Sequence, residues 1–200
     1  ELRLSGEMGR VSYQTGVFHF QEKLDSDGGF AIDSVAAGQP PGASQFFLSY
    51  FTRKQDSKSD SVFGQLDFGL TNTLKAQAGL RYTSNDRSAV YGNIPPGPPL
   101  IGQPIGRKDL IALFGARSQS ILGSDESKTT YLLGLNYTPN DRTMIYGKVS
   151  TGFKGGGFDQ VGTFNPETNT ALEAGIKKNF GASGQHYLNA SVFTYDYADL

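Results

Sequence analysis

The chain has 200 residues and a formal net charge of −1, which gives no basis for binding to nucleic acid. It contains 26 glycines, 14 phenylalanines and 10 tyrosines but only 37% hydrophobic residues, a composition that favours β-structure over helix. The absence of cysteine excludes disulfides and thiolate metal sites, and no apolar run approaches the ~20 residues of a membrane helix, although membrane strands would show no such run either.

The first part of the chain predicts the end of one strand and a long second strand. Residues 1–5 alternate, residues 6–9 form a turn, and residues 10–23 alternate again between an apolar and a polar face. Residues 25–44 are predicted as loop because glycine and proline are frequent there. Residues 45–60 leave two interpretations open, either a strand that extends above a membrane or a small element within the loop.

The clearest alternation lies in residues 61–70 and 74–83, which predict a hairpin with a tight turn at 71–73. Leucines and other apolar residues occupy one face, and Asp67, Lys75 and Arg81 occupy the other. A soluble β-sandwich would show the same alternation with its apolar face buried, so the pattern alone leaves both classes open.

The longest interruption covers residues 85–127 and contains NIPPGPPLIGQP, which cannot form a central strand. A second hairpin follows from residue 128, with turn chemistry at 138–142 and Lys148 in the middle of its second strand. A lysine at that position indicates a polar interior.

The last part predicts a loop at 154–165, strands at 172–180 and 187–197, and a tight turn at 181–184. Short connections therefore alternate with long ones along the chain, which places every turn at one end of an up-and-down meander and every loop at the other. Bacterial outer-membrane barrels have this asymmetry, and aromatic residues near strand ends resemble their interfacial girdles. A soluble antiparallel barrel with loops at one mouth remains the alternative.

Several motifs resemble the barrel domain of TonB-dependent outer-membrane receptors. They are Gly152-Phe153-Lys154 before a glycine run, Pro166-Glu167, Glu173-Ala174-Gly175-Ile176-Lys177 and Asn189-Ala190. Earlier stretches at 16–25, 63–71 and 78–88 also match, so the resemblance spans nearly the whole chain. Each motif is moderately specific, but their order and spacing together are strongly indicative.

The resemblance implies an all-β fold: an antiparallel up-and-down meander of about eight strands, part of a transmembrane β-barrel of about 22 strands with a plugged lumen. Residues 1–200 are expected to be about a third of that barrel, without the plug domain and the barrel-closing C-terminal strands.

The resemblance also implies active uptake of a scarce, bulky nutrient across the outer membrane of a Gram-negative bacterium, with ferric siderophores as the commonest class. The partners it implies are outer-membrane lipid, the protein's own plug domain, the energy-coupling TonB complex and the ligand. We expect no cofactor, no metal site and no nucleic-acid partner. We also expect no enzymatic activity, because no nucleophile–base–acid set is visible.

Two groups of candidate site residues follow from the resemblance. Charged residues on the polar faces are expected to line the lumen, where they contact the plug or substrate or are simply solvated: Asp67, Lys75, Arg81, Lys148, Glu173 and Lys177. Residues of the predicted extracellular loops are candidate ligand contacts, with packing inside the loops as the alternative: Tyr91, Phe153, Lys154 and Phe158.

Two other functional classes remain open, a soluble β-barrel or sandwich that binds ligands with its loops, and a passive porin or adhesin. Side-chain burial separates the soluble class from the membrane class. In a membrane barrel Leu66, Leu80 and Leu133 point outward to lipid while Arg81 and Lys148 point inward, and a soluble fold requires the reverse.

Overall fold

The computed structural model describes residues 1–33, 46–94, 118–159 and 162–199, and these residues form an all-β structure. Among them, no helix is both long enough and apolar enough to cross a membrane. Eight strands form one antiparallel sheet in the order β1-β2-β3-β4-β5-β6-β9-β10, and β7 and β8 form a separate two-stranded sheet. The strands are β1 (Leu2–Met8), β2 (Val11–Asp33), β3 (Phe46–Gly69), β4 (Leu74–Ile94), β5 (Ser118–Asn140), β6 (Thr143–Lys154), β7 (Gly157–Phe158), β8 (Thr163–Phe164), β9 (Glu167–Phe180) and β10 (His186–Ala198).

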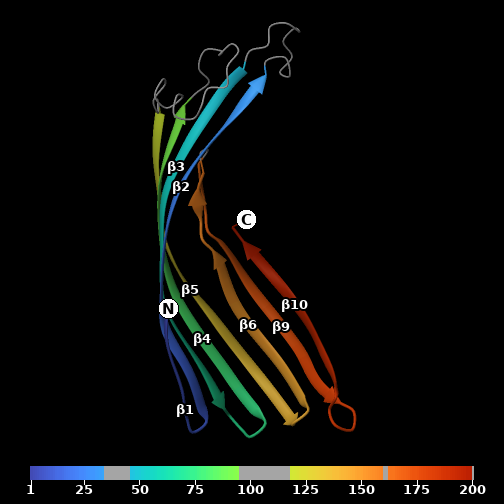
Figure 1. Cartoon of the computed structure of the whole chain (residues 1–200). Coiled ribbons are helices and arrows are strands. Elements are labelled where there is room, and N and C mark those ends of the chain that lie inside the picture. The colour runs from blue at the N-terminus through green and yellow to red at the C-terminus, as the bar shows by residue number, and fades with distance from the viewer. Residues whose placement is uncertain (34–45, 95–117, 160–161, 200) are drawn as a thin grey trace.

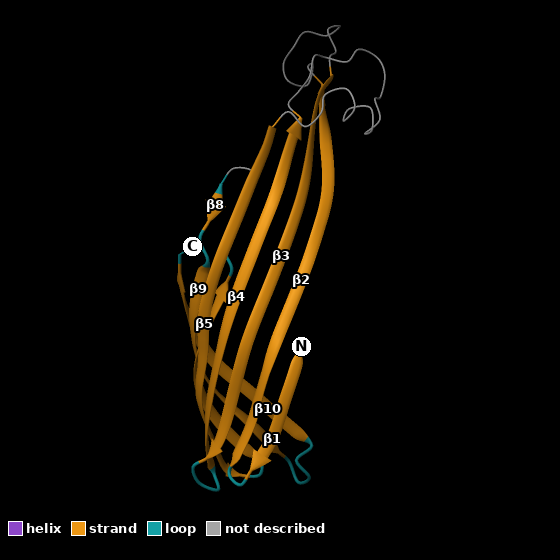
Figure 2. Ribbon diagram, turned by 90° about the vertical axis from the view of Figure 1, so that its left-hand side faces the viewer, coloured by secondary structure: helices purple, strands orange, loops and turns teal. Residues whose placement is uncertain are grey.

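The main sheet is a curved meander in which every strand pairs with its neighbour in the chain, apart from the β7–β8 excursion (Figure 1). The short turns that join β1 to β2, β3 to β4, β5 to β6 and β9 to β10 all lie at one end of the sheet, called here the lower end (Figure 2). The predicted fold class and the predicted asymmetry of the short turns are therefore confirmed for the described residues.

The two faces of the sheet differ in chemistry and in exposure. The inner face carries Asp67, Arg81 and Lys148, and the outer face carries the leucines predicted to point outward. Outer residues splay apart and remain exposed, with Leu80 at 60% and Leu133 at 52%, whereas the inner hydroxyl of Thr83 is only 7% exposed. Because side chains converge on the concave side of a curved sheet, this difference makes the polar face the concave one. A soluble fold would require the outer leucines to meet in a dry centre. In the described part of the chain they do not, because they are exposed.

Four strands are longer than the sequence predicts. β2 continues to Asp33 and β3 begins at Phe46, so much of the predicted loop at 25–44 is strand, and the uncertain stretch 45–60 is a strand extension. β4 continues to Ile94 and β5 begins at Ser118, so the predicted interruption at 85–127 was wrong at both of its ends. In these upper sections polar and charged residues such as Lys23, Asp56 and Asp86 also occupy the outer face, and the alternation that marks a strand in the sequence is therefore lost. The proline-rich centre of that interruption lies outside the described residues.

Smaller boundary differences occur elsewhere. β1 runs through the predicted turn at 6–9, so the turn consists of Gly9 and Arg10, and φ of Gly9 is 61°, which favours glycine. β9 begins at Glu167 rather than at residue 172, and a short hairpin of β7 and β8 occupies part of the loop predicted at 154–165.

Aromatic rings cover glycines of neighbouring strands on the inner face. A Cβ atom on Gly16 would lie 2.7 Å from Cζ of Phe63, and one on Gly175 would lie 2.7 Å from Cε1 of Tyr146. Gly16 pairs with Phe63, and Gly175 pairs with Tyr146, across adjacent strands. The missing side chain leaves the space in which the partner's ring lies flat on the sheet, so an interior glycine is stabilised by its neighbour.

Arginines join successive turns at the lower end. Nη1 of Arg10 donates to the carbonyl of Leu70 at 3.4 Å, and Nη1 of Arg142 donates to the carbonyl of Gly181 at 3.1 Å. These contacts add donors to turn carbonyl groups that lie beyond the strand ladder, and the carbonyl of Gly181 also accepts the N–H of Gly184 at 3.2 Å.

Candidate functional site

The candidate site is the inner face of the curved sheet. Strand pairing places all six predicted lumen residues on it: Lys75 lies opposite Gly69, two residues from Asp67, Arg81 lies opposite Phe63, and Lys148 lies opposite Glu173. Lys177 is four residues further along β9 than Glu173, so it shares this face. The residues do not form one cluster. They belong to separate groups, one on β3 and β4 and the other on β6 and β9.

One group is centred on Glu173 and joins β6 to β9. Nζ of Lys148 lies 2.8 Å from Oε2 of Glu173, and Oη of Tyr146 donates to its Oε1 at 2.5 Å. Lys177 completes the group, with its Nζ 5.7 Å from the centroid of the Tyr146 ring. The carboxylate of Glu173 is thus fixed by two donors, and the group carries a net positive charge when both lysines are protonated.

A second group is centred on Arg81 and joins β2, β3 and β4. Its guanidinium carbon lies 5.5 Å from the ring centroids of both Phe18 and Phe63. Nη2 donates to Oγ of Ser61 at 2.9 Å, and Nε donates to Oγ1 of Thr83 at 3.2 Å. The rings and hydroxyls hold the arginine in one orientation along the inner face, where its remaining N–H groups can bind an anion.

Asp67 belongs to a smaller polar contact near the lower end. Nε2 of Gln77 donates to Oδ1 of Asp67 at 2.8 Å, which links β3 to β4. This contact and the groups at Arg81 and Glu173 make the lower half of the inner face a hydrogen-bonded, charged surface. Such a surface suits contact with water or with a polar partner.

A strap crosses the inner face above these groups. We define the strap as residues 155–159 and 162–166, which leave the end of β6, include β7 and β8, and return to β9. Nη1 of Arg87 donates to the carbonyl of Gly156 at 2.7 Å, and the N–H of Gly156 donates to Oε2 of Glu126 at 2.9 Å. Nδ2 of Asn85 donates to the other oxygen of Glu126 at 3.3 Å. Both backbone groups of one strap residue, Gly156, are therefore bound by side chains of β4 and β5.

The contact between the strap and the sheet is the hydrophobic core of the described residues. Phe158 is 6% exposed, Tyr91 is 7% exposed and Ala89 is 2% exposed, with Leu122 packed against them. The rings of Tyr91 and Phe158 meet edge to face with centroids 6.5 Å apart, and Arg53 lies over the Tyr91 ring. A ligand reaches neither ring while the strap lies in this position.

The predicted loop residues therefore have different surroundings from those expected. Tyr91 lies on β4, and Phe153 and Lys154 end β6, so the prediction that they lie in loops was wrong, because the flanking strands extend further than their alternation shows. Nζ of Lys154 forms an ion pair with Oε1 of Glu167 at 2.9 Å. A recess of about 370 Å³ adjoins this ion pair and is lined by Gly152, Phe153, Lys154, Glu167, Thr168, Asn169 and Tyr197.

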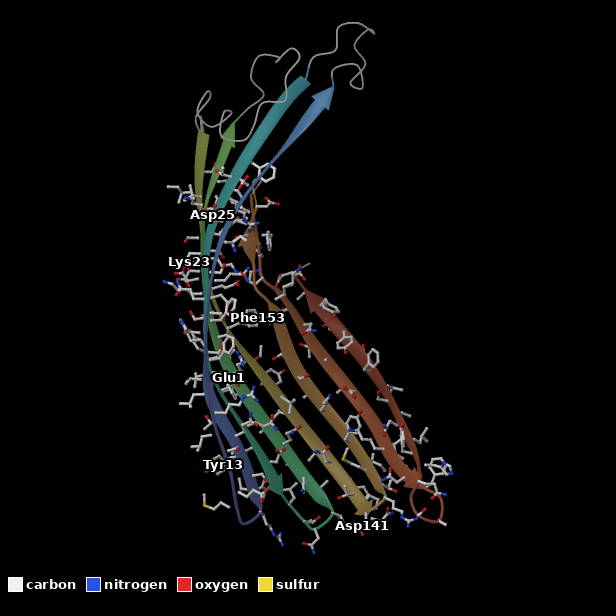
Figure 3. All side chains as sticks on the ribbon, viewed as in Figure 1. Glu1, Tyr13, Lys23, Asp25, Asp141 and Phe153 are labelled. Atoms are coloured by element: carbon white, nitrogen blue, oxygen red, sulfur yellow. The ribbon has the colours of Figure 1, made fainter. Side chains whose placement is uncertain are left out.

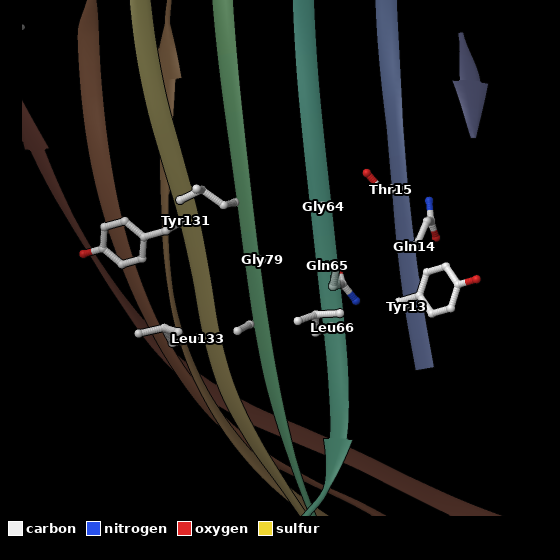
Figure 4. Close-up of a pocket in the computed structure, with 11 residues that line it drawn as sticks. Tyr13, Gln14, Thr15, Gly64, Gln65, Leu66, Gly79, Tyr131 and Leu133 are labelled. Atoms are coloured by element: carbon white, nitrogen blue, oxygen red, sulfur yellow. The ribbon is translucent and has the colours of Figure 1, made fainter. Parts of the chain in front are cut away.

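The outer face carries an apolar band in its lower half. A shallow groove of about 610 Å³ runs across it, lined by residues that include Tyr13, Leu66, Leu80, Tyr131 and Leu133 (Figure 4). Gly64 opens this groove, since a Cβ there would meet only Oγ1 of Thr15, at 3.9 Å. The size and apolar lining suit hydrocarbon chains lying against the sheet.

Higher on the outer face the side chains become charged. Along β2, Tyr13 lies near the lower end and Lys23 and Asp25 lie well above it (Figure 3). His19 contacts Asp60 at 2.7 Å, and Nζ of Lys23 lies 3.7 Å from Oδ2 of Asp56. The boundary between the apolar and charged outer sections therefore falls between Val17 and His19 on this strand.

Sequence reasoning did not identify Arg87, Glu126 or Phe63. Arg87 and Glu126 are 39 residues apart and meet Gly156 from two strands, which no local pattern reveals. The available signal was the unusual run Gly155-Gly156-Gly157, whose lack of side chains allows close contact. A Cβ on Gly155 would lie 2.3 Å from Oε1 of Glu126. Within the described residues, no three acidic or histidine side chains are grouped to bind a metal ion.

Comparison with known proteins gives a family match over the full length. The family model described as TonB dependent receptor-like, beta-barrel matches residues 1–200. Comparison with curated proteins gives no match.

Solved structures of three receptors share the fold. The ferric yersiniabactin uptake receptor FyuA from Yersinia pestis is similar with a TM-score of 0.73 and 16% identity, over 99% of this chain and 28% of that chain. The siderophore receptor PiuA from Acinetobacter baumannii has a TM-score of 0.63 and 14% identity, over 94% and 29%. The alcaligin outer-membrane receptor FauA from Bordetella pertussis has a TM-score of 0.52 and 13% identity, over 99% and 32%. The chain thus spans less than a third of the length of each.

Proposed function

The chain belongs to the TonB-dependent receptor family, within its β-barrel region, and on that premise we propose that the whole protein is an outer-membrane receptor that imports a ferric siderophore. The similarity to PiuA and FyuA supports the substrate class, because PiuA is named as a siderophore receptor and FyuA as an uptake receptor for ferric yersiniabactin. The localisation proposed is the outer membrane of a Gram-negative bacterium.

The observation that carries this proposal is the two-faced curved sheet. Its outer face exposes leucines and tyrosines in a continuous lower band, while its inner face is charged and hydrogen-bonded. In a bilayer only a closed sheet satisfies its backbone groups, and an apolar outside with a polar inside is the pattern of outer-membrane barrels. In water the same outer band would be a large exposed apolar surface, which promotes aggregation.

The inner face then lines the lumen of the barrel. The proposed partners there are the protein's own plug domain and the ligand, and energy is proposed to come from the TonB complex. Arg81, Lys148, Glu173 and Lys177 offer fixed charges to either partner. Of the candidate ligand contacts, Phe153 and Lys154 have the better geometry, because they line an open recess, whereas Tyr91 and Phe158 are buried against each other.

Iron-limited growth tests the proposal directly. A strain that lacks the gene is grown on a panel of single ferric siderophores, with and without the full-length gene restored, and uptake of the radiolabelled complexes is measured. We expect at least one complex to support growth and uptake only when the gene is present, and a protonophore to abolish that uptake.

Two results would overturn the proposal in different ways. Uptake that continues after the proton gradient collapses would indicate a passive pore. Failure of every ferric siderophore, with the protein present in outer-membrane fractions, would remove the proposed substrate class. A third result, recovery of the full-length protein only in soluble fractions, would favour the soluble binding module.

A further inference from the structure

Two neighbouring rows of inner side chains cross four strands around Arg81. The upper row consists of residues at directly paired positions: Phe18, Ser61, Thr83 and Lys128. The lower row is paired in the same way and consists of Gly16, Phe63, Arg81 and Thr130. Arg81 and Lys128 are therefore diagonal neighbours on β4 and β5, a relation that separates two residues by about 7–8 Å and lets long side chains reach a common point.

The guanidinium of Arg81 is held in place without using all of its donors. The rings of Phe18 and Phe63 each lie 5.5 Å from its central carbon, and its contacts with Ser61 and Thr83 use two N–H groups. The N–H groups that remain have no acceptor in the described part of the chain. Arg81 is thus an oriented cation with unused donors.

The two hydroxyl groups beside Arg81 are buried, since Ser61 and Thr83 are each only 7% exposed. Oγ1 of Thr83 donates to Oγ of Ser61 at 3.2 Å, and Ser61 also accepts from Nη2 of Arg81 at 2.9 Å. Ser61 therefore has its own O–H left to donate, and no described residue accepts it. A buried donor without an acceptor is costly, so this O–H indicates a missing acceptor.

Lys128 forms no ion pair or hydrogen bond with any residue that the structure describes. Two carboxylates are near these rows, but each has another partner. Glu126 accepts from Nδ2 of Asn85 and from a backbone N–H. Glu1 is close enough to Arg81 to interact electrostatically, but it forms its ion pair with Arg3. Arg81, Ser61 and Lys128 thus bring together donors and positive charge without a matching acceptor.

From this arrangement we propose that Arg81, Lys128 and Ser61 form an oxyanion-binding site that takes a carboxylate or phosphate group on the inner face. The planar fork of Arg81 binds two oxygen atoms, Lys128 adds a second positive charge, and Ser61 donates its O–H. The site deepens the proposed function and rests on it, because this face lines a lumen only in the proposed barrel. Two sources carry such a group, a diffusible ligand and another part of the same protein.

The test measures phosphate binding by the full-length receptor in lipid bilayers. Urea unfolding is followed over a series of inorganic phosphate concentrations, with chloride keeping the ionic strength constant. Phosphate that binds the folded state stabilises it in proportion to its occupancy, which gives a Kd. Lys128→Gln is the main variant, because it removes a charge without breaking a described contact, and Arg81→Gln is the second. Lys58→Gln is the matched control, since Lys58 is an exposed lysine on the outer face, opposite Asp86.

For a site open to a diffusible anion, we expect the phosphate Kd to rise about tenfold or more in Lys128→Gln and Arg81→Gln, the usual effect of losing one charge-assisted contact. Lys58→Gln should bind phosphate as the parent does, and Lys128→Arg should retain binding because it keeps the charge. If a carboxylate of the receptor itself fills the site, phosphate has no effect on the parent. The stability losses of the two glutamine variants are then coupled, and the double variant loses less than their sum.

Equal phosphate stabilisation in the parent, Lys128→Gln and Lys58→Gln would overturn the site, because the effect would then be a general one of the salt. Absence of any phosphate effect, together with additive losses in the double variant, would overturn it as well. The measurement needs neither transport nor a known ligand. Iron uptake in strains with the same variants reports on the proposed function separately, so failure of one is distinguishable from failure of the other.

Discussion

The lower and upper halves of β4 share one backbone ladder but follow different rules for their outer side chains. From Leu74 to Tyr82 the outer positions are apolar, with Leu80 60% exposed, whereas Ser84, Asp86 and Ser88 occupy the same face above them. The lower section has the length of ~9–11 residues with which a tilted strand crosses a bilayer. Strand pairing continues unchanged across the boundary, so the ladder alone does not depend on which solvent the outer face meets.

The inner face shows the reverse trend. In the lower half it is polar and held by pairs such as Lys148 and Glu173, while in the upper half it includes the dry contact of Phe158, Tyr91 and Ala89. In the described residues, apolar side chains therefore gather on the inner face of the upper half and on the outer face of the lower half. A chain built for water throughout, or for lipid throughout, would not need this exchange.

A charge placed in the outer apolar band should have the largest effect on stability and assembly. Leu133→Arg puts a cation on the outer face of β5 beside Ala78 and Val149, and we expect a loss of about 2–4 kcal/mol, the usual penalty near the centre of a bilayer. The control is Ser127→Arg on the same face of the same strand but in the charged section, which should assemble normally. Heat-modifiable migration of the full-length receptor from outer membranes measures assembly. Equal assembly of the two variants would show that the lower band does not face lipid.

A smaller effect is expected where a ring covers a glycine. Gly175→Ala places a Cβ 2.7 Å from the Tyr146 ring and should destabilise the folded protein by about 1–3 kcal/mol through overpacking. Gly147→Ala is the matched control, because no atom lies within 4 Å of its added Cβ. Urea unfolding of the receptor in lipid bilayers compares them. The double variant with Tyr146→Ala should recover part of the loss, and full additivity would contradict the ring contact as its cause.

Neutralising the carboxylate of Glu173, at the centre of the group that joins β6 to β9, should have less effect on stability than the added methyl at Gly175. Glu173→Gln keeps an acceptor for Tyr146 but removes the charge that pairs with Lys148, and solvent on the inner face compensates for part of the change. The urea midpoint of this variant should fall between those of the parent protein and Gly175→Ala. A loss larger than that of Gly175→Ala would indicate that the group is far less hydrated than its exposure indicates.

The smallest effect is expected in the upper outer section. Lys23→Ala removes an ion pair with Asp56 whose lysine side chain is 76% exposed, and such pairs contribute less than about 1 kcal/mol. Unfolding at low and high salt measures it, and the difference from the parent should vanish at high salt. A loss as large as that of Leu133→Arg would erase the distinction between the two sections.

The sequence predicts the lower half of the sheet well because its two faces meet different solvents. Leu66 and Leu80 alternate with Asp67 and Arg81, and this period-two pattern identifies both the strands and their turns. In the upper half polar residues also occupy the outer face, so the two faces differ less and the pattern fades. The run Asp25–Phe30 contains aspartates and glycines typical of turns, yet Asp27 pairs with Thr52 and Gly28 with Phe51 in a continuous ladder.

The candidate site was predicted only as far as local patterns reach. Alternation assigned Asp67, Lys75, Arg81, Lys148, Glu173 and Lys177 to the polar face, and strand pairing places them there. The binding of Gly156 by Arg87 and Glu126 depends on how far the strap folds back over the sheet, which is a tertiary property. Similarly, nothing in the sequence near Phe18 indicates that its ring lies beside Arg81, 63 positions later.

The rings that cover Gly16 and Gly175 also record how neighbouring strands are aligned. If β2 slipped by one residue against β3, a residue with a side chain would lie beneath the Phe63 ring, and the apolar and polar faces of β2 would exchange. A misaligned hairpin therefore meets a steric clash and a solvation penalty together. Each pair of ring and glycine therefore helps to set the register of its hairpin, because it disfavours misaligned strand pairs during assembly of the sheet.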